Sequence, residues 1–267
     1  MKNEYIPVEQ LFRVAEKYKP SLEVIPLNMP IFDNAMDGGV RGGELITVSA
    51  QTGHGKTTFL QNLTIRFHEQ QVPVLWFTYE MSPWYLKEKF VSMGQDKDLL
   101  AYSPMELVEQ SKEFVDAKIK EALFTESCKI VMIDHLHYLI PLQGGSNTSM
   151  LVGAIVRELK KMAVKHDVCI FLIAHTKKVY QAEELGLDSI RDSSLVAQES
   201  DYVFLIERVK KEKGNLKLSL KPVEPEYKTD WTNIMKVSLA KNRRRGEMVY
   251  NHFKINNNIM THTDETK

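Results

Sequence analysis

The sequence has little cysteine. Its 267 residues include two cysteines, Cys128 and Cys169, and each lies inside an apolar stretch. Two cysteines exclude a disulfide scaffold and a four-cysteine zinc module. Free cysteines in apolar surroundings are typically buried. We therefore expect both thiols to be buried and reduced, as in a cytosolic protein.

An excess of charge of either sign is also absent. There are 35 Lys and Arg residues against 35 Asp and Glu residues, so the formal net charge is zero. A neutral chain gives no global indication of nucleic-acid binding, and any such surface must be local. The apolar fraction of 43% and the charged fraction of 26% are ordinary for globular proteins and argue against disorder. The length allows one large domain or two small ones.

Long apolar runs are missing as well. No stretch approaches 18 uninterrupted apolar residues, so no membrane-spanning helix is predicted. Residues 1–8 contain Glu4 and Pro7 and lack the apolar segment of a signal peptide and the arginines of a transit peptide. We expect a protein of the cytoplasm, or of a phage-infected or organellar equivalent, without a membrane partner.

Short apolar strands alternate with helical patterns along the chain. Strands are expected at residues 44–49, 74–78, 129–133, 168–174 and 202–206. Helices are expected at residues 56–67, 84–93, about 105–123 and 150–163. This alternation predicts an α/β fold with a mostly parallel, twisted sheet covered by helices on both faces. Strands at 235–240 and 249–255 have no helix between them and should form an antiparallel C-terminal extension.

The N-terminal segment predicts a separate small element. Residues 8–18 form an amphipathic pattern that ends before Pro20, and a helix this short needs a partner surface on its own domain or on a neighbouring subunit. We divide the chain into an arm with this helix at 1–24 and a main domain at 25–267. Residues 208–221 are locally basic, and we interpret them as a solvated hairpin.

A glycine-containing turn follows the first apolar strand and precedes a helical pattern. It reads Ala50-Gln51-Thr52-Gly53-His54-Gly55-Lys56-Thr57. This matches the P-loop pattern, except that Ala50 stands where the strict pattern has glycine. Small residues let consecutive backbone N–H groups turn toward phosphate oxygens, and the helix N-terminus adds its positive dipole end. The turn therefore predicts a phosphate site.

The P-loop gives its residues separate roles, with ATP and Mg²⁺ as the expected cofactors. Lys56 should reach the β- and γ-phosphates, and Thr57 should place its hydroxyl on Mg²⁺. We expect the His54 side chain to face solvent and to take no part in catalysis. The predicted nucleotide-binding set is Thr52, Gly53, His54, Gly55, Lys56, Thr57 and Thr58.

Two carboxylates follow neighbouring apolar strands. Asp134 comes directly after residues 130–133 and fits the metal-side carboxylate that a P-loop needs, holding Mg²⁺ through water. Glu80 lies just beyond residues 74–78, at the strand edge where ligands bind in open α/β sheets. On the residues alone, Glu80 is either the group that orients an attacking water or an ordinary capping or surface glutamate.

Six motifs in order carry a family resemblance. They are Gly42-Gly43-Glu44-Leu45, the P-loop, Tyr79-Glu80-Met81-Ser82, Ile133-Asp134-His135-Leu136, Ala174-His175 and Lys241-Asn242-Arg243. Together they resemble RecA-type motor domains, and most closely those of hexameric replicative DNA helicases: DnaB and, more nearly, the phage primase–helicase and mitochondrial Twinkle branch. The resemblance covers roughly residues 25–256 and implies a RecA-like P-loop ATPase core.

The resemblance also implies catalytic roles. Glu80 corresponds to the catalytic base. His175 corresponds to the residue that senses the γ-phosphate, which is glutamine in DnaB and histidine in the phage and Twinkle branch. Lys241 and Arg243 correspond to the pair that reaches across the subunit interface to the neighbour's ATP.

A further segment resembles the region behind the DNA loop of the central channel. It spans residues 189–194, and DnaB's Arg-Glu-Ser-Gly is Arg-Asp-Ser-Ser here. The loop at 176–187 precedes it, and the polar loop at 143–149 is either a second channel loop or an ordinary connection. The implied DNA contacts are Lys177, Lys178, Arg191, Asp192 and Ser194.

The function implied is that of a ring-forming, ATP-dependent DNA helicase, a homo-oligomer and most simply a hexamer, moving 5′→3′ on single-stranded DNA in replication. No primase, zinc-binding or collar domain precedes the motor, so we expect a minimal motor, a motor that recruits a separate primase or loader, or a ring that needs DNA or nucleotide to close. The helix at 8–18 resembles the linker helix that docks on the adjacent subunit. A RadA-like recombination or branch-migration ATPase and a KaiC-like regulatory ATPase without a DNA role remain alternatives.

Overall fold

The computed structural model describes residues 23–106, 111–140, 148–177, 185–190, 193–210 and 231–263. The strands are β1 (Leu45–Ala50), β2 (Val74–Thr78), β3 (Ala101–Tyr102), β4 (Ile130–Asp134), β5 (Cys169–His175), β6 (Tyr202–Lys210), β7 (Trp231–Asn242), β8 (Val249–Asn256) and β9 (Ile259–His262). The helices are α2 (Pro30–Ala35), α3 (Lys56–Glu69), α4 (Pro83–Ser92), α5 (Lys112–Glu126), α6 (Thr148–His166) and α7 (Ser193–Glu199), with 3₁₀ turns at Leu136–Leu139 and Leu187–Ser189.

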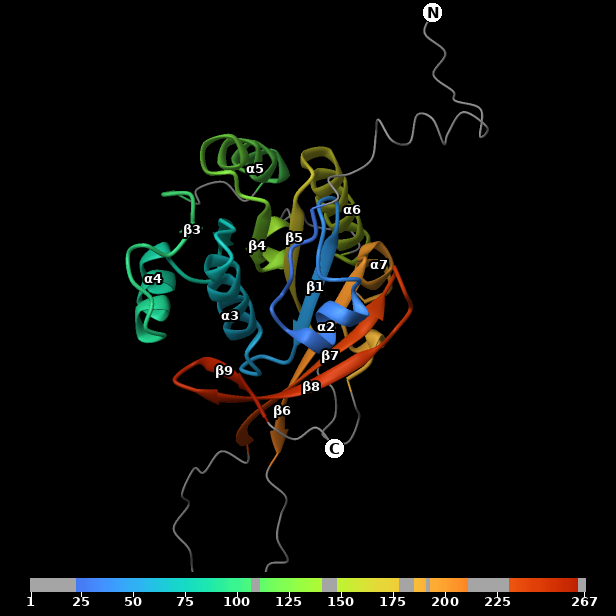
Figure 1. Ribbon diagram of the computed structural model, residues 1–267. Coiled ribbons are helices and arrows are strands. Elements are labelled where there is room, and N and C mark those ends of the chain that lie inside the picture. Colours follow the sequence, from blue (N-terminus) through green and yellow to red (C-terminus); the bar gives the residue numbers. More distant parts are fainter. Residues whose placement is uncertain are drawn as a thin grey trace, which may run out of the picture.

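One sheet organises the described part of the chain (Figure 1). Its nine strands run in the order β3-β2-β4-β5-β1-β6-β7-β8-β9. All pairings from β3 to β6 are parallel, and those from β6 to β9 are antiparallel. This confirms the predicted mixed sheet, in which the chain crosses between strands by helices until it reaches the C-terminal extension.

Helices cover both faces of the sheet. Strand β4 shows the alternation that separates these faces, because Ile130 and Met132 join one buried cluster while Val131 and Ile133 join the other. The first cluster also contains apolar residues of α2, α3 and α4, and the second contains those of α5, α6 and α7. Strands buried on both faces explain why the sequence reads as continuous apolar runs rather than alternating ones.

The antiparallel extension turns back onto α3. The side chain of Asn62, on α3, donates to the carbonyl of Asn258 and accepts from the amide of Met260, each at 2.8 Å. These bonds join α3 to the turn between β8 and β9 and to β9 itself. The helix that begins at the P-loop is therefore held both by the parallel sheet and by the C-terminal strands.

The register of the parallel strands places the carboxyl ends of four strands side by side. Ala50, at the end of β1, pairs with His175 at the end of β5, and Thr78 pairs with Asp134 at the ends of β2 and β4. Because β2, β4, β5 and β1 are consecutive in the sheet, their carboxyl ends form one continuous edge.

One expected helix is wrong at its start. The helix predicted from about residue 105 begins at Lys112, where the Ser111 side chain accepts a hydrogen bond from the amide of Phe114 at 3.1 Å. Met105 is not helical and is 96% exposed. The polar residues of this region lack a strong apolar period, so the cap rather than the pattern sets the boundary.

Several elements were not predicted. The short helices α2 and α7 and the strands β3 and β9 have too few residues for a clear period. Cys128 and Cys169 are buried and free of disulfides, as expected. The predicted helix at 8–18 and most of the basic segment at 208–221 lie outside the described residues, and the domain boundary at residue 24 stays a prediction. Of the helices in the described ranges, none combines the length and the apolar character needed to cross a bilayer.

Phe204 lies at the centre of the core and gives a test of it. Its buried ring in β6 packs on Phe32 of α2 and Phe59 of α3, with ring centroids 5.3 and 5.6 Å apart. Phe204→Ala should lower the free energy of unfolding by about 3–5 kcal/mol, because it removes the ring and leaves a cavity. Phe124→Ala, at a ring that is 90% exposed, should change it by less than about 0.5 kcal/mol. Urea titrations of both variants measure this, and equal effects would contradict the core assignment.

Candidate nucleotide-binding site

The P-loop has the backbone conformation that a phosphate cradle needs. Gly53 and Gly55 have φ angles of +81° and +100°, which favour glycine. A Cβ atom on Gly55 would also lie 2.4 Å from the Met235 side chain. Helix α3 starts directly after Gly55, so the N–H groups of its first turn have no partner within the helix. Thr52 and Gly53 are exposed at the loop, and Thr58 is half-buried. An anion would find exposed amide groups and a helix N-terminus here.

Lys56 occupies the inside of this loop. Its side chain is buried, and Nζ donates to the carbonyls of Ala50 at 3.1 Å and Gln51 at 3.2 Å. Burial lowers the pKa of Lys56, while the nearby Asp134 and Glu80 carboxylates act in the opposite direction. The ammonium group is thus held at the loop, where a phosphate would add the negative charge that favours it.

Thr57 and Asp134 lie together, as the predicted Mg²⁺ position requires. Thr57 Oγ1 donates to Asp134 Oδ2 at 2.7 Å. The carboxyl group is fully buried, and its Oδ1 receives no hydrogen bond from the described residues. Burial raises the pKa of Asp134 to about 6, the Thr57 bond lowers it and the Glu80 carboxylate raises it. A buried oxygen that lacks a donor, beside a threonine hydroxyl, fits a hard cation that prefers oxygen ligands.

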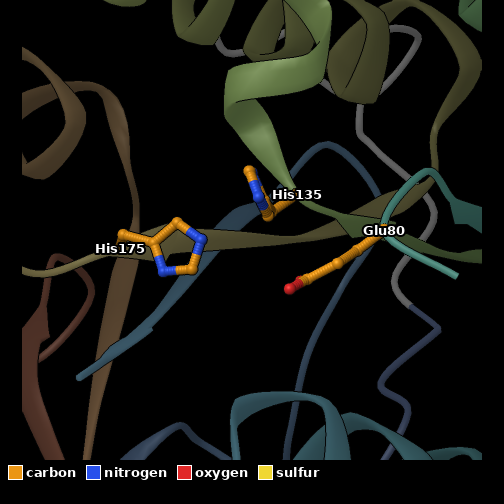
Figure 2. A group of neighbouring side chains, drawn as sticks. All are labelled: Glu80, His135 and His175. Carbon is orange, nitrogen blue, oxygen red and sulfur yellow. The ribbon is translucent and has the colours of Figure 1, made fainter. Parts of the chain in front are cut away.

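Glu80, His135 and His175 converge beside this pair. Figure 2 shows their side chains directed toward one another from the segments that follow or end β2, β4 and β5. One ligand atom of each lies within 4.8 Å of the others, and the rings of His135 and His175 are 4.4 Å apart in an edge contact. Burial lowers the pKa of His135 to about 4, and His175, His137 and Lys56 contribute, so the His135 ring is neutral at pH 7.

Sequence reasoning selected Glu80 and His175 but gave His135 no role. The only local signal for His135 was its place directly after Asp134. Its importance depends on the parallel register, which places the ends of β4 and β5 side by side.

The expectation that the His54 side chain faces solvent is wrong. Its side chain is buried rather than solvent-facing, and Nδ1 accepts a hydrogen bond from the amide of Arg208 at 3.3 Å. Its ring makes an edge contact with Trp231 at 4.8 Å. Burial lowers the pKa of His54, and Lys56, Arg208 and Lys210 lower it further. The ring therefore ties the P-loop to β6 and β7.

Lys241 and Arg243 lie at the opposite edge of the sheet, where the amino ends of the parallel strands are. Lys241 pairs with Val203 near the start of β6, whereas Ala50, just before the P-loop, pairs with Ile206. Arg243 lies beyond the end of β7, so it is about five residues, or about 16 Å, back along the sheet from the P-loop. The structure does not bring either side chain to the nucleotide site of its own chain.

Both cations are held at the end of α7. Lys241 Nζ donates to the carbonyls of Ala197, Gln198 and Ser200 at 2.6–3.1 Å. Arg243 donates to Gln198 and forms an ion pair with Asp201 at 3.0 Å. Cations on the last carbonyls of a helix match its dipole.

Asp201 connects this region to the start of β1. Its Oδ2 accepts from the amide of Leu45 at 2.8 Å and from Lys160 Nζ at 2.6 Å, and Lys160 also donates to the carbonyl of Gly43 at 2.6 Å. The Arg243 position is thus fixed relative to the strand that leads into the P-loop.

Most of the predicted DNA contacts fall outside the described residues. Lys178, Arg191 and Asp192 lie there, as does the side chain of Ser194, whose backbone belongs to α7. Lys177 follows β5, and its amide donates to the carbonyl of Ser189 at 2.7 Å. This bond places the start of the 176–187 loop beside the segment that precedes Arg191.

Burial of the Asp134 charge predicts a gain in stability when that charge is removed. Asp134→Asn keeps an acceptor for Thr57 Oγ1. Because the pKa of Asp134 rises from 3.8 to about 6 on folding, the folded state binds this proton more tightly, and the wild type loses stability as pH rises from about 4 to about 6. At pH 7, with EDTA and without nucleotide, the variant should be more stable by about 3 kcal/mol.

Urea titrations at a series of pH values measure this difference. It should shrink toward zero below about pH 3, where the wild-type carboxyl is protonated in both states. Asp98→Asn, at an exposed aspartate, should change stability by less than about 0.5 kcal/mol throughout. A less stable Asp134→Asn protein at pH 7 would contradict the assigned cost of burial.

Comparisons with known proteins agree with this fold. A family model described as an AAA domain matches residues 30–181, which is more than half of the chain. Replicative DNA helicase DnaB of Mycoplasma pneumoniae is 25% identical, with 74% of this chain and 50% of the relative covered. DnaB of Treponema pallidum is 23% identical, with 70% and 49% covered. The chain therefore spans about half the length of these curated relatives.

Solved structures share the whole fold. A structure described as an ATPase domain matches with a TM-score of 0.75 at 17% identity, and 96% of this chain and 97% of that chain are covered. A structure described as a DnaB-like replicative helicase and its interactions with primase matches with a TM-score of 0.73 at 17% identity, covering 97% and 69%. The RecA-like ATPase fold and the resemblance to DnaB-type helicase motors are thus confirmed, and the extent of the family match shows that the chain belongs to the AAA domain family.

Proposed function

We propose that this chain is the ATP-hydrolysing motor of a ring-forming DNA helicase, which moves on single-stranded DNA and couples hydrolysis at subunit interfaces to unwinding in replication. The observation that carries the proposal is the separation of the site over two sheet edges. The P-loop, Asp134, Glu80 and His175 meet at one edge, and Lys241 and Arg243 lie at the other.

The first edge supports nucleotide binding. The α3 amides and Lys56 would hold the phosphates, and Lys56 would exchange its carbonyl contacts for phosphate oxygens. The Thr57 hydroxyl and the Asp134 carboxylate are the groups that would hold Mg²⁺, which neutralises phosphate charge when bound.

The position of Glu80 supports a role in activating water. Its side chain is exposed. The backbone just before it is held to β4, because the amide of Tyr79 donates to the carbonyl of Asp134 at 2.8 Å. A carboxylate here can accept a proton from a water aligned with the γ-phosphate. His175, at the last position of β5 and beside the P-loop strand, can contact the same phosphate and report its presence to the loop that follows.

The second edge supports a function that depends on assembly. Because Arg243 cannot reach the P-loop of its own chain, it can serve a nucleotide only in a neighbouring subunit. An arginine acting in trans would neutralise charge that develops on the γ-phosphate. Closed head-to-tail rings repeat one such interface around a rotation axis, and we propose a homohexamer.

The DNA and partner assignments rest on the resemblance. The similarity to DnaB supports single-stranded DNA as the track, 5′→3′ movement, and contacts from the segments that hold Lys177, Lys178 and Arg191. One similar structure describes interactions with primase, and we propose that this motor also works with a separate primase or loader in the cytoplasm.

Direct DNA binding separates the helicase from the regulatory alternative. Salt-dependent binding of single-stranded DNA, with little sequence preference, fits a motor and not a KaiC-like switch. Electron microscopy with an ATP analogue then separates a closed ring from a RadA-like filament.

The chemistry at the first edge gives the next prediction. Lys56→Ala should abolish ATP binding, because it removes the cation of the phosphate cradle. Glu80→Gln should bind ATP normally and hydrolyse it at least about a hundredfold more slowly, because the amide cannot accept the proton of water. Equilibrium binding and steady-state hydrolysis measure the two effects. Glu113→Gln, at an exposed glutamate on α5, is the control, and near-normal turnover in Glu80→Gln would remove Glu80 from the mechanism.

Mixing two inactive variants tests action in trans. Arg243→Ala should bind ATP but lose most hydrolysis, while Arg245→Ala, at an exposed ion pair with Asp37, should retain it. Mixed one to one with Lys56→Ala, Arg243→Ala should regain activity, because about a quarter of randomly assembled interfaces combine an intact P-loop with an intact arginine. Hydrolysis by the mixture equal to the sum of the separate variants would exclude the trans role.

A further inference from the structure

Two imidazoles and one carboxylate meet at the nucleotide edge, outside the oxygen-rich Thr57–Asp134 pair. Glu80, His135 and His175 each offer one ligand atom, and these atoms lie within 4.8 Å of one another (Figure 2). The residues follow or end β2, β4 and β5, which are neighbours in the sheet. Their proximity is therefore set by strand register and not by a single loop.

We propose that Glu80, His135 and His175 form a binding site for a transition-metal dication, Zn²⁺ in particular, distinct from the Mg²⁺ position. Two histidines and one glutamate are a ligand set of zinc sites that keep an open fourth position. Imidazole nitrogens suit zinc and its neighbours in the transition series, whereas Mg²⁺ prefers oxygen ligands. The oxygen donors of Thr57 and Asp134 therefore favour Mg²⁺, and the nitrogen donors of His135 and His175 favour Zn²⁺.

The distances allow such a site after small side-chain rotations. Zinc bonds of about 2.0–2.2 Å place tetrahedral ligand atoms about 3.3–3.6 Å apart. The ligand atoms here are no more than 4.8 Å apart, and the Glu80 side chain is exposed, so its carboxylate can move toward the rings without displacing core residues.

One existing hydrogen bond must be exchanged. His135 Nδ1 accepts from the amide of His137 at 3.2 Å, so the neutral ring carries its proton on Nε2. A metal on Nδ1 replaces that bond directly, and a metal on Nε2 moves the proton to Nδ1 and also ends it. Binding thus exchanges one long hydrogen bond for a metal–nitrogen bond.

Occupancy would inhibit the motor, a consequence that rests on the proposed function. A carboxylate bound to zinc cannot accept a proton from the attacking water, and a metal-bound His175 cannot contact the γ-phosphate. Zn²⁺ would therefore act as a brake, that is, as an inhibitor of ATP hydrolysis whose effect excess Mg²⁺ does not reverse.

Binding is tested without nucleotide, on the full chain in millimolar Mg²⁺, with Co²⁺ as a coloured probe that Zn²⁺ displaces. The wild type should bind one equivalent and show visible d–d absorption. His135→Asn, His175→Asn and Glu80→Gln should each weaken binding at least about tenfold, since each removes one ligand. His252→Asn, at a half-buried histidine in β8, should bind like the wild type.

A ligand exchange keeps the test decisive if a variant folds poorly. His135→Cys should retain one equivalent of Co²⁺ and add a near-ultraviolet thiolate-to-cobalt band, which requires position 135 to bind the metal. Absence of stoichiometric binding by the wild type, or equal binding by the His135, His175 and Glu80 variants, would overturn the site.

Inhibition is measured separately by ATP hydrolysis in excess Mg²⁺. His135→Asn should need at least about ten times more Zn²⁺ than the wild type to halve its own zinc-free rate, and His252→Asn should match the wild type. Equal zinc sensitivity of His135→Asn and the wild type would overturn the brake. A chain that bound Co²⁺ as expected but hydrolysed no ATP would reject the proposed function and leave the metal site standing.

Discussion

The carboxylate of Asp134 is buried at the end of β4, and the groups that match its charge come from other elements. Thr57 reaches it from the first turn of α3 at 2.7 Å, and the Lys56 ammonium acts on it from the same turn. Neither contact forms unless β4 lies in register beside β2 and β5, one strand away from β1. An ionised carboxylate in this position opposes folding in the absence of a cation, so this corner of the fold is suited to gaining stability from a ligand.

Hydrogen bonds and ring contacts connect both ends of β1 to other strands of the sheet. At the nucleotide edge, the P-loop is tied to β6 and β7 through His54, Arg208 and Trp231. At the other edge, Asp201 joins the start of β1 to Arg243. Strand β1 therefore ends at one half of the proposed catalytic site and begins beside the other half. If Arg243 contacts the nucleotide of a neighbouring subunit, movement of Arg243 would disturb its ion pair with Asp201. Because Asp201 is bonded to the start of β1, that movement would also act on the strand that leads into the P-loop of the same chain as Arg243.

Sequence patterns predicted the parts of this structure that depend on local chemistry. The alternation of buried strands with helices follows from residue type and spacing and was predicted correctly. The same patterns indicated the P-loop turn and Asp134, which the structure brings together through Thr57, while their roles in nucleotide binding stay predictions. The burial of His54 was not predicted, because its contacts, Arg208 and Trp231, are distant in sequence and meet the loop only after the antiparallel extension forms. Strand β9 is too short for a clear period, and its hydrogen bond to Asn62 of α3 is a long-range contact that no local pattern reveals.

His135 shows the same limit at the site itself. In the sequence it is one polar residue after an apolar strand, and nothing local separates it from an ordinary turn residue. Register places it against His175, and the combined edge then offers oxygen donors from Thr57 and Asp134 beside nitrogen donors from His135 and His175. Glu80 lies near both groups, since it acts on the Asp134 charge and approaches the two rings. The Glu80 carboxylate can therefore activate water or bind a metal, but not both at once. For this reason a transition metal bound here would inhibit ATP hydrolysis.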